Sequence, residues 1–265
     1  MRKYLSFLLF LPLLFGCGNR ARTTETANVE PMYERVYMKD AHGAVIRINP
    51  DKPVIYMFFT FDKSFEGTEH VLDVLAKHNI QAFFCPTGNT LRDPEFYPLF
   101  RRIIADGHSF GGHGNKHILW APWPPAERVS LVSRDSLMND LYLNMREFER
   151  FGVNVSQIRY FNPPYQWYTA EQVEWVAEFG QTLFNFTPGV RTGADWTTPD
   201  MPNYMSSPRI IESLFEFEAT HELGLNGAIM LIHPGTDPRR IDKLYHHLDY
   251  IIERLKGLGY SFGRL

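Results

Sequence analysis

From about Val45 onward, short apolar runs alternate with segments that have the spacing of amphipathic helices, and this alternation restricts the fold more than any other feature. The runs with strand-like composition are Val54–Phe61, Ala82–Cys85, Ser109–Gly112, Arg159–Phe161, Thr182–Phe186, Ala228–Ile232 and Tyr260–Phe262. The helix-like segments are Thr68–His78, Glu95–Ala105, Asp135–Phe151, Ala170–Phe179, Arg209–Leu223 and Arg239–Lys256. Seven strands that alternate with helices predict a parallel α/β fold, either an open doubly wound sheet or a barrel.

Polar residues at the strand ends favour the barrel. Asp62, His113, Asn162 and His233 each come just after a predicted strand. In a βα barrel such positions converge on one rim, where active sites are found, whereas an open sheet would spread them along an edge. The first strand is followed by neither a GxGxxG motif nor a P-loop, so a nucleotide-binding fold has no positive support.

The segment Gly107–His117 (GHSFGGHGNKH) is the strongest local signal of chemistry. His113 and His117 are four positions apart, so one turn of chain can direct both imidazoles at a single ion, and neutral imidazole suits zinc, nickel, cobalt or iron. The nearby glycines permit unusual backbone angles that a helix interior would not use. The alternative is an exposed histidine pair that recurs by chance.

Two further residues have the chemistry that such a site needs. Asp62 ends the apolar run VIYMFFTF, where a carboxylate is costly unless it is paired or bound to metal, so it is the best candidate for a third ligand. His233 ends another apolar run and is a candidate general acid. The alternatives are a helix-capping aspartate and a hydrogen-bonded core histidine.

Two loop motifs complete the set. Asn162-Pro163-Pro164-Tyr165 is a rigid turn that can direct a backbone N–H into the site as an oxyanion donor, or it is a plain turn. Asp195-Trp196 supplies a carboxylate and a ring that can stack on a sugar, or it is an ordinary loop with a buried indole.

The order of these motifs resembles that of the polysaccharide deacetylase family, carbohydrate esterase family 4, over roughly residues 50–265. The matching motifs are Thr60-Phe61-Asp62, the histidine segment His113–His117, Asn162–Tyr165, Asp195-Trp196 and Leu231-Ile232-His233. The resemblance implies a single domain with a distorted (β/α)7 barrel. It also implies metal-dependent removal of N- or O-linked acetyl groups from a glycan.

The resemblance assigns roles to residues. Asp62 is the base or a metal ligand with His113 and His117, and His233 is the acid. Tyr165 supplies the oxyanion N–H. The substrate-binding positions are Asn162, Pro164, Tyr165, Asp195, Trp196 and Leu231. The expected metal is zinc, with cobalt, nickel, manganese and iron as alternatives, and Trp196, Trp167 and Tyr168 form the expected stacking floor.

The chain departs from the family pattern at three positions. Lys63 stands where the family has a second, metal-binding aspartate, Gly114 replaces a serine or threonine, and Asn162 replaces the arginine that orients the base. Three outcomes follow: Asp62 becomes a ligand and Glu66 the base, or water completes the metal shell, or metal and activity are lost. In the last case the protein is a glycan-binding lipoprotein on a deacetylase scaffold. A weaker alternative is another metalloenzyme with two histidines and one carboxylate, such as an iron-dependent oxygenase.

The first residues have the features of a targeting signal. Residues 1–16 (MRKYLSFLLFLPLLFG) have a basic start and an apolar run too short to span a bilayer, which is typical of an export signal. Leu14-Phe15-Gly16-Cys17 resembles a bacterial lipoprotein box; the alternative is an ordinary signal peptide with a chance cysteine. We therefore expect a lipid on Cys17, a linker and N-terminal segment over 17–45, a catalytic domain over 46–265, and a membrane-tethered protein of the cell envelope.

Charge and cysteine content exclude other classes. The net charge of −3 argues against a nucleic-acid binder that works by bulk electrostatics. Two cysteines are too few for a disulfide-stapled scaffold, and Cys85 is expected to be a buried, inert thiol. The expected partners are an acetylated glycan and the membrane, and the protein is expected to be a monomer.

Overall fold

A computed structural model describes residues 35–265; the predicted leader and Cys17 lie outside the described residues. The strands are β1 Tyr37–Lys39, β2 Val45–Ile48, β3 Val54–Phe61, β4 Phe83–Pro86, β5 Ser109–Phe110, β6 Tyr160–Phe161, β7 Thr182–Leu183, β8 Ile229–Ile232 and β9 Ser261–Gly263. The α-helices are α1 Thr68–His78, α2 Gly88–Leu91, α3 Tyr97–Ala105, α4 Arg134–Glu149, α5 Ala170–Glu178, α6 Ser207–Thr220 and α7 Leu248–Gly257. No helix within residues 35–265 combines the length and the apolar character needed to cross a membrane.

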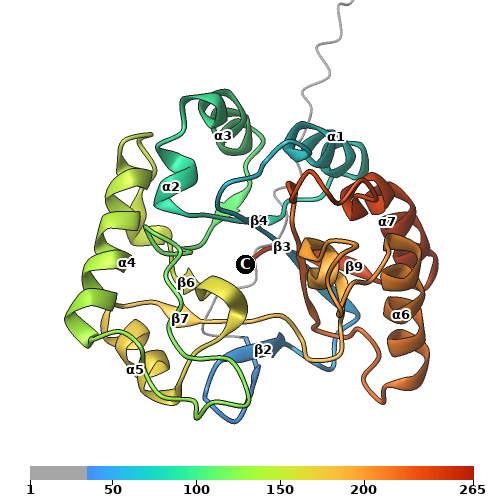
Figure 1. The fold of residues 1–265 in the computed structure, drawn as a ribbon. Coiled ribbons are helices and arrows are strands. Elements are labelled where there is room, and N and C mark those ends of the chain that lie inside the picture. Colours follow the sequence, from blue (N-terminus) through green and yellow to red (C-terminus); the bar gives the residue numbers. More distant parts are fainter. Residues whose placement is uncertain (1–34) are drawn as a thin grey trace, which may run out of the picture.

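The strands form a distorted ring surrounded by the helices (Figure 1). β3 pairs in parallel with β4 and β8, β4 pairs with β5, and β6 pairs with β7. Three isolated bridges join the remaining neighbours: Gly112 with Phe161, Phe184 with Val45, and Arg47 with Ala228. These pairings close the circuit β3–β4–β5–β6–β7–β2–β8, so the polar residues at the strand ends share one rim, as the sequence predicts.

One segment of the ring was not predicted from the sequence. β2 lies between β7 and β8 and forms a hairpin with β1, although this part of the chain overlaps the predicted linker. The predicted strand Tyr260–Phe262 is present as β9, but it is not one of the seven strands of the circuit. It pairs in parallel with the first residues of β3, beginning with Ser261 opposite Val54. The four-residue β2 carries too little periodicity to be distinguished from a loop.

The inside of the ring is filled by apolar side chains. This cluster contains Val45, Ile48, Tyr56, Phe58, Phe83, Cys85, Tyr160, Phe184, Ile229, Leu231 and Leu265. The final residues of the sequence therefore seal the end of the barrel at which the strands begin, and Figure 1 places this end of the chain at the centre of the ring. Arg35 holds them there, because its Nη2 donates to the carbonyl of Arg264 at 2.8 Å.

A larger apolar layer separates the strands from the outer helices. β3 is buried along almost its whole length, as expected for a central parallel strand covered on both faces. The amphipathic α1 turns Val71, Leu72 and Leu75 into this layer and ends at Asn79, which adopts the left-handed conformation common after helices. Cys85 is buried and its burial raises the pKa of the thiol, which confirms the prediction of an inert residue.

The predicted helix Arg239–Lys256 is wrong in its first half. Residues 239–243 form a loop, Leu244–His247 form a short 3-10 helix, and α7 begins only at Leu248. The loop folds around the ammonium of Lys243, which donates to the carbonyls of Thr236 and Asp237 at 2.9 and 3.1 Å. In this segment, hydrogen bonds from the Lys243 ammonium to loop carbonyls thus take the place of the backbone hydrogen bonds of the predicted helix.

Candidate active site

The rim of the barrel opens into a cavity of about 1050 Å³. The predicted site residues that line it are Asp62, His113, His117, Tyr165, Trp196, Leu231 and His233. They come from the ends of different strands, so the convergence expected of a βα barrel is present. The alternative of a scattered edge, which an open sheet would produce, is wrong.

His113 is held in a defined orientation. Its Nδ1 lies 2.8 Å from the carbonyl of Asn162, so Nδ1–H donates there and leaves the Nε2 lone pair free. Its backbone N–H donates to Oδ1 of the buried Asn144. Burial holds the pKa of His113 well below its usual range, with the charge of His117 acting in the same direction. The imidazole is therefore neutral at pH 7, the form that binds metal.

His117 lies beside His113, with 5.0 Å between the ring centroids. Burial lowers the pKa of His117 to about 4; Asp62 opposes this shift, whereas His233 and Lys63 add to it. The backbone of His117 is left-handed, with φ of 53°. This loop geometry, rather than a helical turn, brings the two imidazoles together.

Asp140 of α4 holds the loop between the two histidines. Its buried carboxylate accepts the backbone N–H groups of Asn115 at 2.8 Å and Lys116 at 3.1 Å. Gly114 has φ of +78°, and a Cβ there would lie 2.6 Å from Asp140 Oδ2. A serine or threonine therefore does not fit at position 114 in this loop, and a carboxylate from another element anchors it.

We expect Asp140→Asn to loosen this loop. An amide offers one acceptor oxygen where the carboxylate offers two, so one buried N–H loses its partner, at a cost of about 1–3 kcal/mol in the free energy of unfolding. Denaturant unfolding measures this, with Asp135→Asn on the same helix as the control because that side chain is 98% exposed. Equal stability of the two variants would contradict the anchoring role.

Asp62 is oriented by two residues that the sequence reasoning missed. Its Oδ1 accepts from Thr87 Oγ1 at 3.1 Å and from Asn89 Nδ2 at 2.9 Å. Asn89 in turn accepts from Arg92 at 2.8 Å. The polar run Thr87-Gly88-Asn89 directly after β4 was the available signal. These residues take the place of the family arginine, because the side-chain amide of Asn162 donates to Gln166 and Phe184 instead.

Lys63 is exposed and lines the same cavity. The two neutral imidazoles fit a divalent cation, with His113 already oriented from behind by a carbonyl. A third protein ligand is not assembled around them. Within residues 35–265, the one group of three or more histidine, cysteine or carboxylate residues whose ligand atoms lie within 4.8 Å of one another is His78, Asp249 and Glu253, which does not include the rim residues.

The group of His78, Asp249 and Glu253 is an ion-pair cluster. Lys77 Nζ lies 2.6 Å from Asp249 Oδ1 and 3.2 Å from Glu253 Oε1. The ammonium of Lys77 therefore occupies the space between the two carboxylates, where a metal ion would have to lie. The cluster therefore ties α1 to α7 and is not a candidate metal site.

Glu66, the suggested substitute base, is engaged elsewhere. Its Oε1 accepts from Lys243 at 2.9 Å and from the Thr236 backbone at 3.1 Å. Burial would raise the pKa of Glu66, but these hydrogen bonds outweigh it and lower the pKa. Glu66 therefore stabilises the loop after β8 and does not replace Asp62.

His233 and Asp195 form a hydrogen-bonded pair. Nδ1 of His233 lies 2.6 Å from Asp195 Oδ1, and the His233 backbone N–H donates to Oδ2 at 2.8 Å. The carboxylate is fully buried, whereas the imidazole remains partly open to the cavity. Asp195 thus fixes the tautomer in which Nδ1 carries a proton and Nε2 faces the cavity. Both residues were predicted from the sequence as site residues, but the contact between them was not.

The turn at Asn162–Tyr165 is unusual in its backbone. Tyr165 and Gln166 both have positive φ, 58° and 59°. Such a conformation is costly for residues with side chains and often marks a functional site. Tyr165 lines the cavity, and its ring lies 4.5 Å from that of His117. The turn therefore places the Tyr165 side chain beside His117 at the wall of the cavity.

The predicted stacking floor is only partly present. Trp196 lines the cavity and is 49% exposed. Tyr168 also lines it, but the residue is buried and its hydroxyl donates to Asp40 at 2.7 Å. Trp167 is covered by the guanidinium of Arg128, 3.4 Å from the ring centroid. Trp167 is half-buried and still lines the cavity, whereas Tyr168 is buried and hydrogen-bonded. The exposed ring in the cavity wall that was not predicted from the sequence is Trp123.

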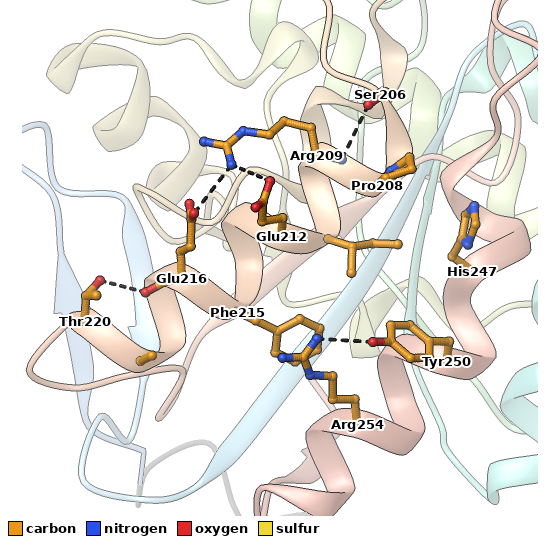
Figure 2. Close-up of a pocket in the computed structure, with 12 residues that line it drawn as sticks. Ser206, Pro208, Arg209, Glu212, Phe215, Glu216, Thr220, His247, Tyr250 and Arg254 are labelled. Atoms are coloured by element: carbon orange, nitrogen blue, oxygen red, sulfur yellow. Dashed lines mark hydrogen bonds and ion pairs between the residues drawn. The ribbon is translucent and has the colours of Figure 1, made fainter.

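A second large hollow, of about 1070 Å³, lies between α6 and α7 (Figure 2). Its polar side chains pair with one another: Arg209 with Glu212 and Glu216, and Arg254 with the hydroxyl of Tyr250. These pairs leave no convergent set of polar groups, so this groove is not a candidate active site.

Comparison with known proteins decides the family. The family model described as polysaccharide deacetylase matches residues 48–184, just over half of the chain. The chain belongs to the polysaccharide deacetylase family. The matched region contains Asp62, His113 and His117, whereas Asp195 and His233 follow it.

Two relatives are similar to this deacetylase-family chain over most of its length. It is 26% identical over 217 residues to a chitooligosaccharide deacetylase of Bradyrhizobium, covering 77% of this chain and 86% of the relative. It is 26% identical over 216 residues to the uncharacterised protein YlxY of Bacillus subtilis, covering 81% of this chain but only 57% of the relative. The match thus spans little more than half of YlxY.

Solved structures show the same fold. The Bacillus subtilis deacetylase PdaA, a family 4 carbohydrate esterase, has a TM-score of 0.62 at 21% identity, covering 84% of this chain and 82% of PdaA. A structure described as a CE4 family pseudoenzyme from Bacillus anthracis has a TM-score of 0.64 at 20% identity, covering 84% of this chain and 68% of that one.

Proposed function

We propose that the protein is a metal-dependent hydrolase that removes acetyl groups from a glycan. The observation that carries the proposal is the pair of neutral imidazoles, His113 and His117, at the rim beside Asp62 and His233. A divalent cation, with zinc as first choice, would polarise the acetyl carbonyl and lower the pKa of bound water. His113 Nε2 and His117 would hold it.

Asp62 and His233 would carry out the two proton transfers of the reaction. Asp62, held through Oδ1 by Thr87 and Asn89, keeps Oδ2 to accept a proton from the attacking water. His233, as an imidazolium with its second proton on Nε2, gives that proton to the leaving nitrogen or oxygen, while Asp195 holds Nδ1–H and stabilises the positive charge. The Tyr165 backbone N–H donates to the oxyanion that develops on the acetyl carbonyl.

Acetate release tests the proposal. The full chain is incubated with N-acetylglucosamine oligomers, peptidoglycan and acetylated xylan, with zinc, cobalt, nickel or manganese added. We expect release that a chelator abolishes and that His113→Ala reduces by on the order of 100-fold or more, since a ligand is lost. His78→Ala, at the ion-pair cluster, is the control. No release from any substrate would overturn the proposal.

Lys63 favours a second candidate, a glycan-binding protein without catalysis. Its ammonium opposes a nearby cation at the position where the family has a metal-binding aspartate. A CE4 neighbour is itself described as a pseudoenzyme, and a mutant of it as having restored activity. Glycan binding without metal uptake and without acetate release would support this candidate. Lipid anchoring at Cys17 stays an expectation of the sequence for either function.

A further inference from the structure

Arg92 directly follows α2 and reaches two parts of the candidate site. Its Nη2 donates to Asn89 Oδ1 at 2.8 Å. Its Nη1 donates to Oδ1 of Asn115, a buried residue of the loop over residues 113–117 (the histidine loop). One guanidinium therefore joins the residue that holds Asp62 to the loop that carries the rim histidines.

The contact with Arg92 decides which way the side-chain amide of Asn89 faces. An arginine side chain has only donors, whereas an ionised carboxylate only accepts. The amide oxygen must therefore face Arg92, and the amide nitrogen Nδ2 then faces Asp62, to which it donates at 2.9 Å. With the amide reversed, a donor would meet a donor at Arg92 and an acceptor would meet an acceptor at Asp62.

The guanidinium of Arg92 is itself held in place by α4. Oε1 of Glu147 accepts from Nη1 at 3.1 Å, and the side chain of Glu147 is only 15% exposed. Arg150 binds the other oxygen of the same carboxylate. The planar, fork-shaped guanidinium thus has acceptors from α2, from the histidine loop and from α4, and these contacts define its position.

A glycine allows α2 and the histidine loop to come this close. A Cβ at Gly88 would lie 2.0 Å from Asn115 Oδ1 and 2.9 Å from Arg92 Nη1. The backbone N–H of Gly88 donates to the Gly114 carbonyl at 3.0 Å, and that of Asn89 donates to the Asn115 carbonyl at 3.1 Å. These backbone hydrogen bonds do not depend on the Arg92 side chain, so the two segments stay together without it.

Thr87, the other partner of Asp62, is held without help from Arg92. Its Oγ1 lies 3.2 Å from Thr90 Oγ1 and accepts the Thr90 backbone N–H at 3.3 Å. Of the two hydrogen bonds to Asp62 Oδ1, the one from Asn89 is therefore the one that depends on Arg92. Through a single amide, Asp62 is joined to a guanidinium, although position 162 holds no arginine.

We propose that Arg92 is a positioning residue for Asp62 and that it acts through Asn89. Arg92 does not touch the reacting atoms. It fixes the amide that holds Oδ1 of Asp62, so that Oδ2 stays directed at the attacking water. The inference rests on the proposed function, in which Asp62 is the base.

Steady-state acetate release by the full chain at saturating zinc tests this role. We expect Arg92→Ala to lower kcat by about tenfold with KM unchanged, since the substrate contacts are left in place. The double variant with Asn89→Ala should be no slower than either single variant, because both substitutions break one chain of hydrogen bonds. Arg150→Ala is the matched control, with kcat retained: it removes a guanidinium from the same Glu147, and its other partner is Tyr97.

Zinc affinity separates an effect on Asp62 from an effect on the histidines. We expect it to change little in Arg92→Ala, because Asp140 still accepts two backbone N–H groups of the histidine loop. Thermal unfolding shows which variants are folded. A folded Arg92→Ala variant with wild-type kcat overturns the inference, and so do additive losses in the double variant or a loss of zinc affinity that matches the loss of rate.

A second measurement needs neither metal nor acetate release. The signal of the Asn89 side-chain amide in a nitrogen–proton NMR spectrum is identified by its loss in Asn89→Ala. Asp62→Asn should shift this signal in the otherwise unchanged chain, and much less when Arg92 is replaced by alanine, because the amide can then rotate away. Equal shifts in both backgrounds overturn the inference. Unequal shifts in a protein that releases no acetate contradict the proposed function alone.

Discussion

Replacing Lys63 by aspartate is expected to raise the affinity for zinc or cobalt on the order of 100-fold, about 2.7 kcal/mol. The side chain is exposed in the cavity and adds to the lowering of the pKa of His117, so its charge acts on the histidine pair. An aspartate removes this charge and adds the third oxygen or nitrogen ligand that zinc sites normally have. Competition titration with a chromogenic chelator measures the change.

Lys63→Ala separates the two contributions in this experiment. It removes the positive charge without adding a ligand, so its affinity should fall between those of the wild type and Lys63→Asp. If the alanine and aspartate variants bind the cation equally well, then position 63 contributes no ligand and the prediction is wrong. Acetate release is expected to increase with cation affinity across the three proteins.

Asp62→Asn is expected to lower acetate release by roughly 100-fold to 10,000-fold, the usual contribution of a general base. The amide keeps the size of the side chain, and its oxygen still accepts from Thr87 and Asn89. The fold should therefore be retained, and cation content should change little. Initial rates on an acetylated glycan, together with metal analysis of the same samples, measure both quantities.

Asn89→Ala is the companion variant for Asp62. It removes one of the two hydrogen bonds that hold Oδ1 and should lower the rate by about tenfold, since the carboxylate remains but is less well oriented. If Asp62→Asn instead loses its cation, then Asp62 is a ligand and not the base. An unchanged rate in Asp62→Asn would exclude Asp62 from either role.

The rim residues were predictable because strand ends are visible in the sequence. Apolar runs followed at once by Asp62 or His233 specify both the strand and the polar group at its end. β2 was missed because a short strand next to polar sequence has no detectable periodicity. β5, β6 and β7 were predicted as strands, but each is only two residues long in the structure and shorter than predicted.

The contacts between distant segments could not be predicted from the sequence. The Asp140 carboxylate occupies the space that a side chain at position 114 would need, although 26 positions separate Asp140 from Gly114. His233 contacts Asp195 across a separation of 38 positions. Trp167 and Trp123 have the same chemistry in the sequence. Only the packing of Arg128 on Trp167 decides which ring is covered and which is open.

The seal at the closed end of the barrel sets the direction in which the cavity faces. Arg35 binds the Arg264 carbonyl there, while Asp62 and His233 lie at the opposite rim. The described part of the chain therefore begins at the face remote from the cavity. Seventeen residues lie between Cys17 and Arg35, and this stretch spans at most about 60 Å when fully extended. We propose that a lipid on Cys17, which the sequence predicts, would attach the domain from the side of Arg35, so that the cavity faces away from the point of attachment.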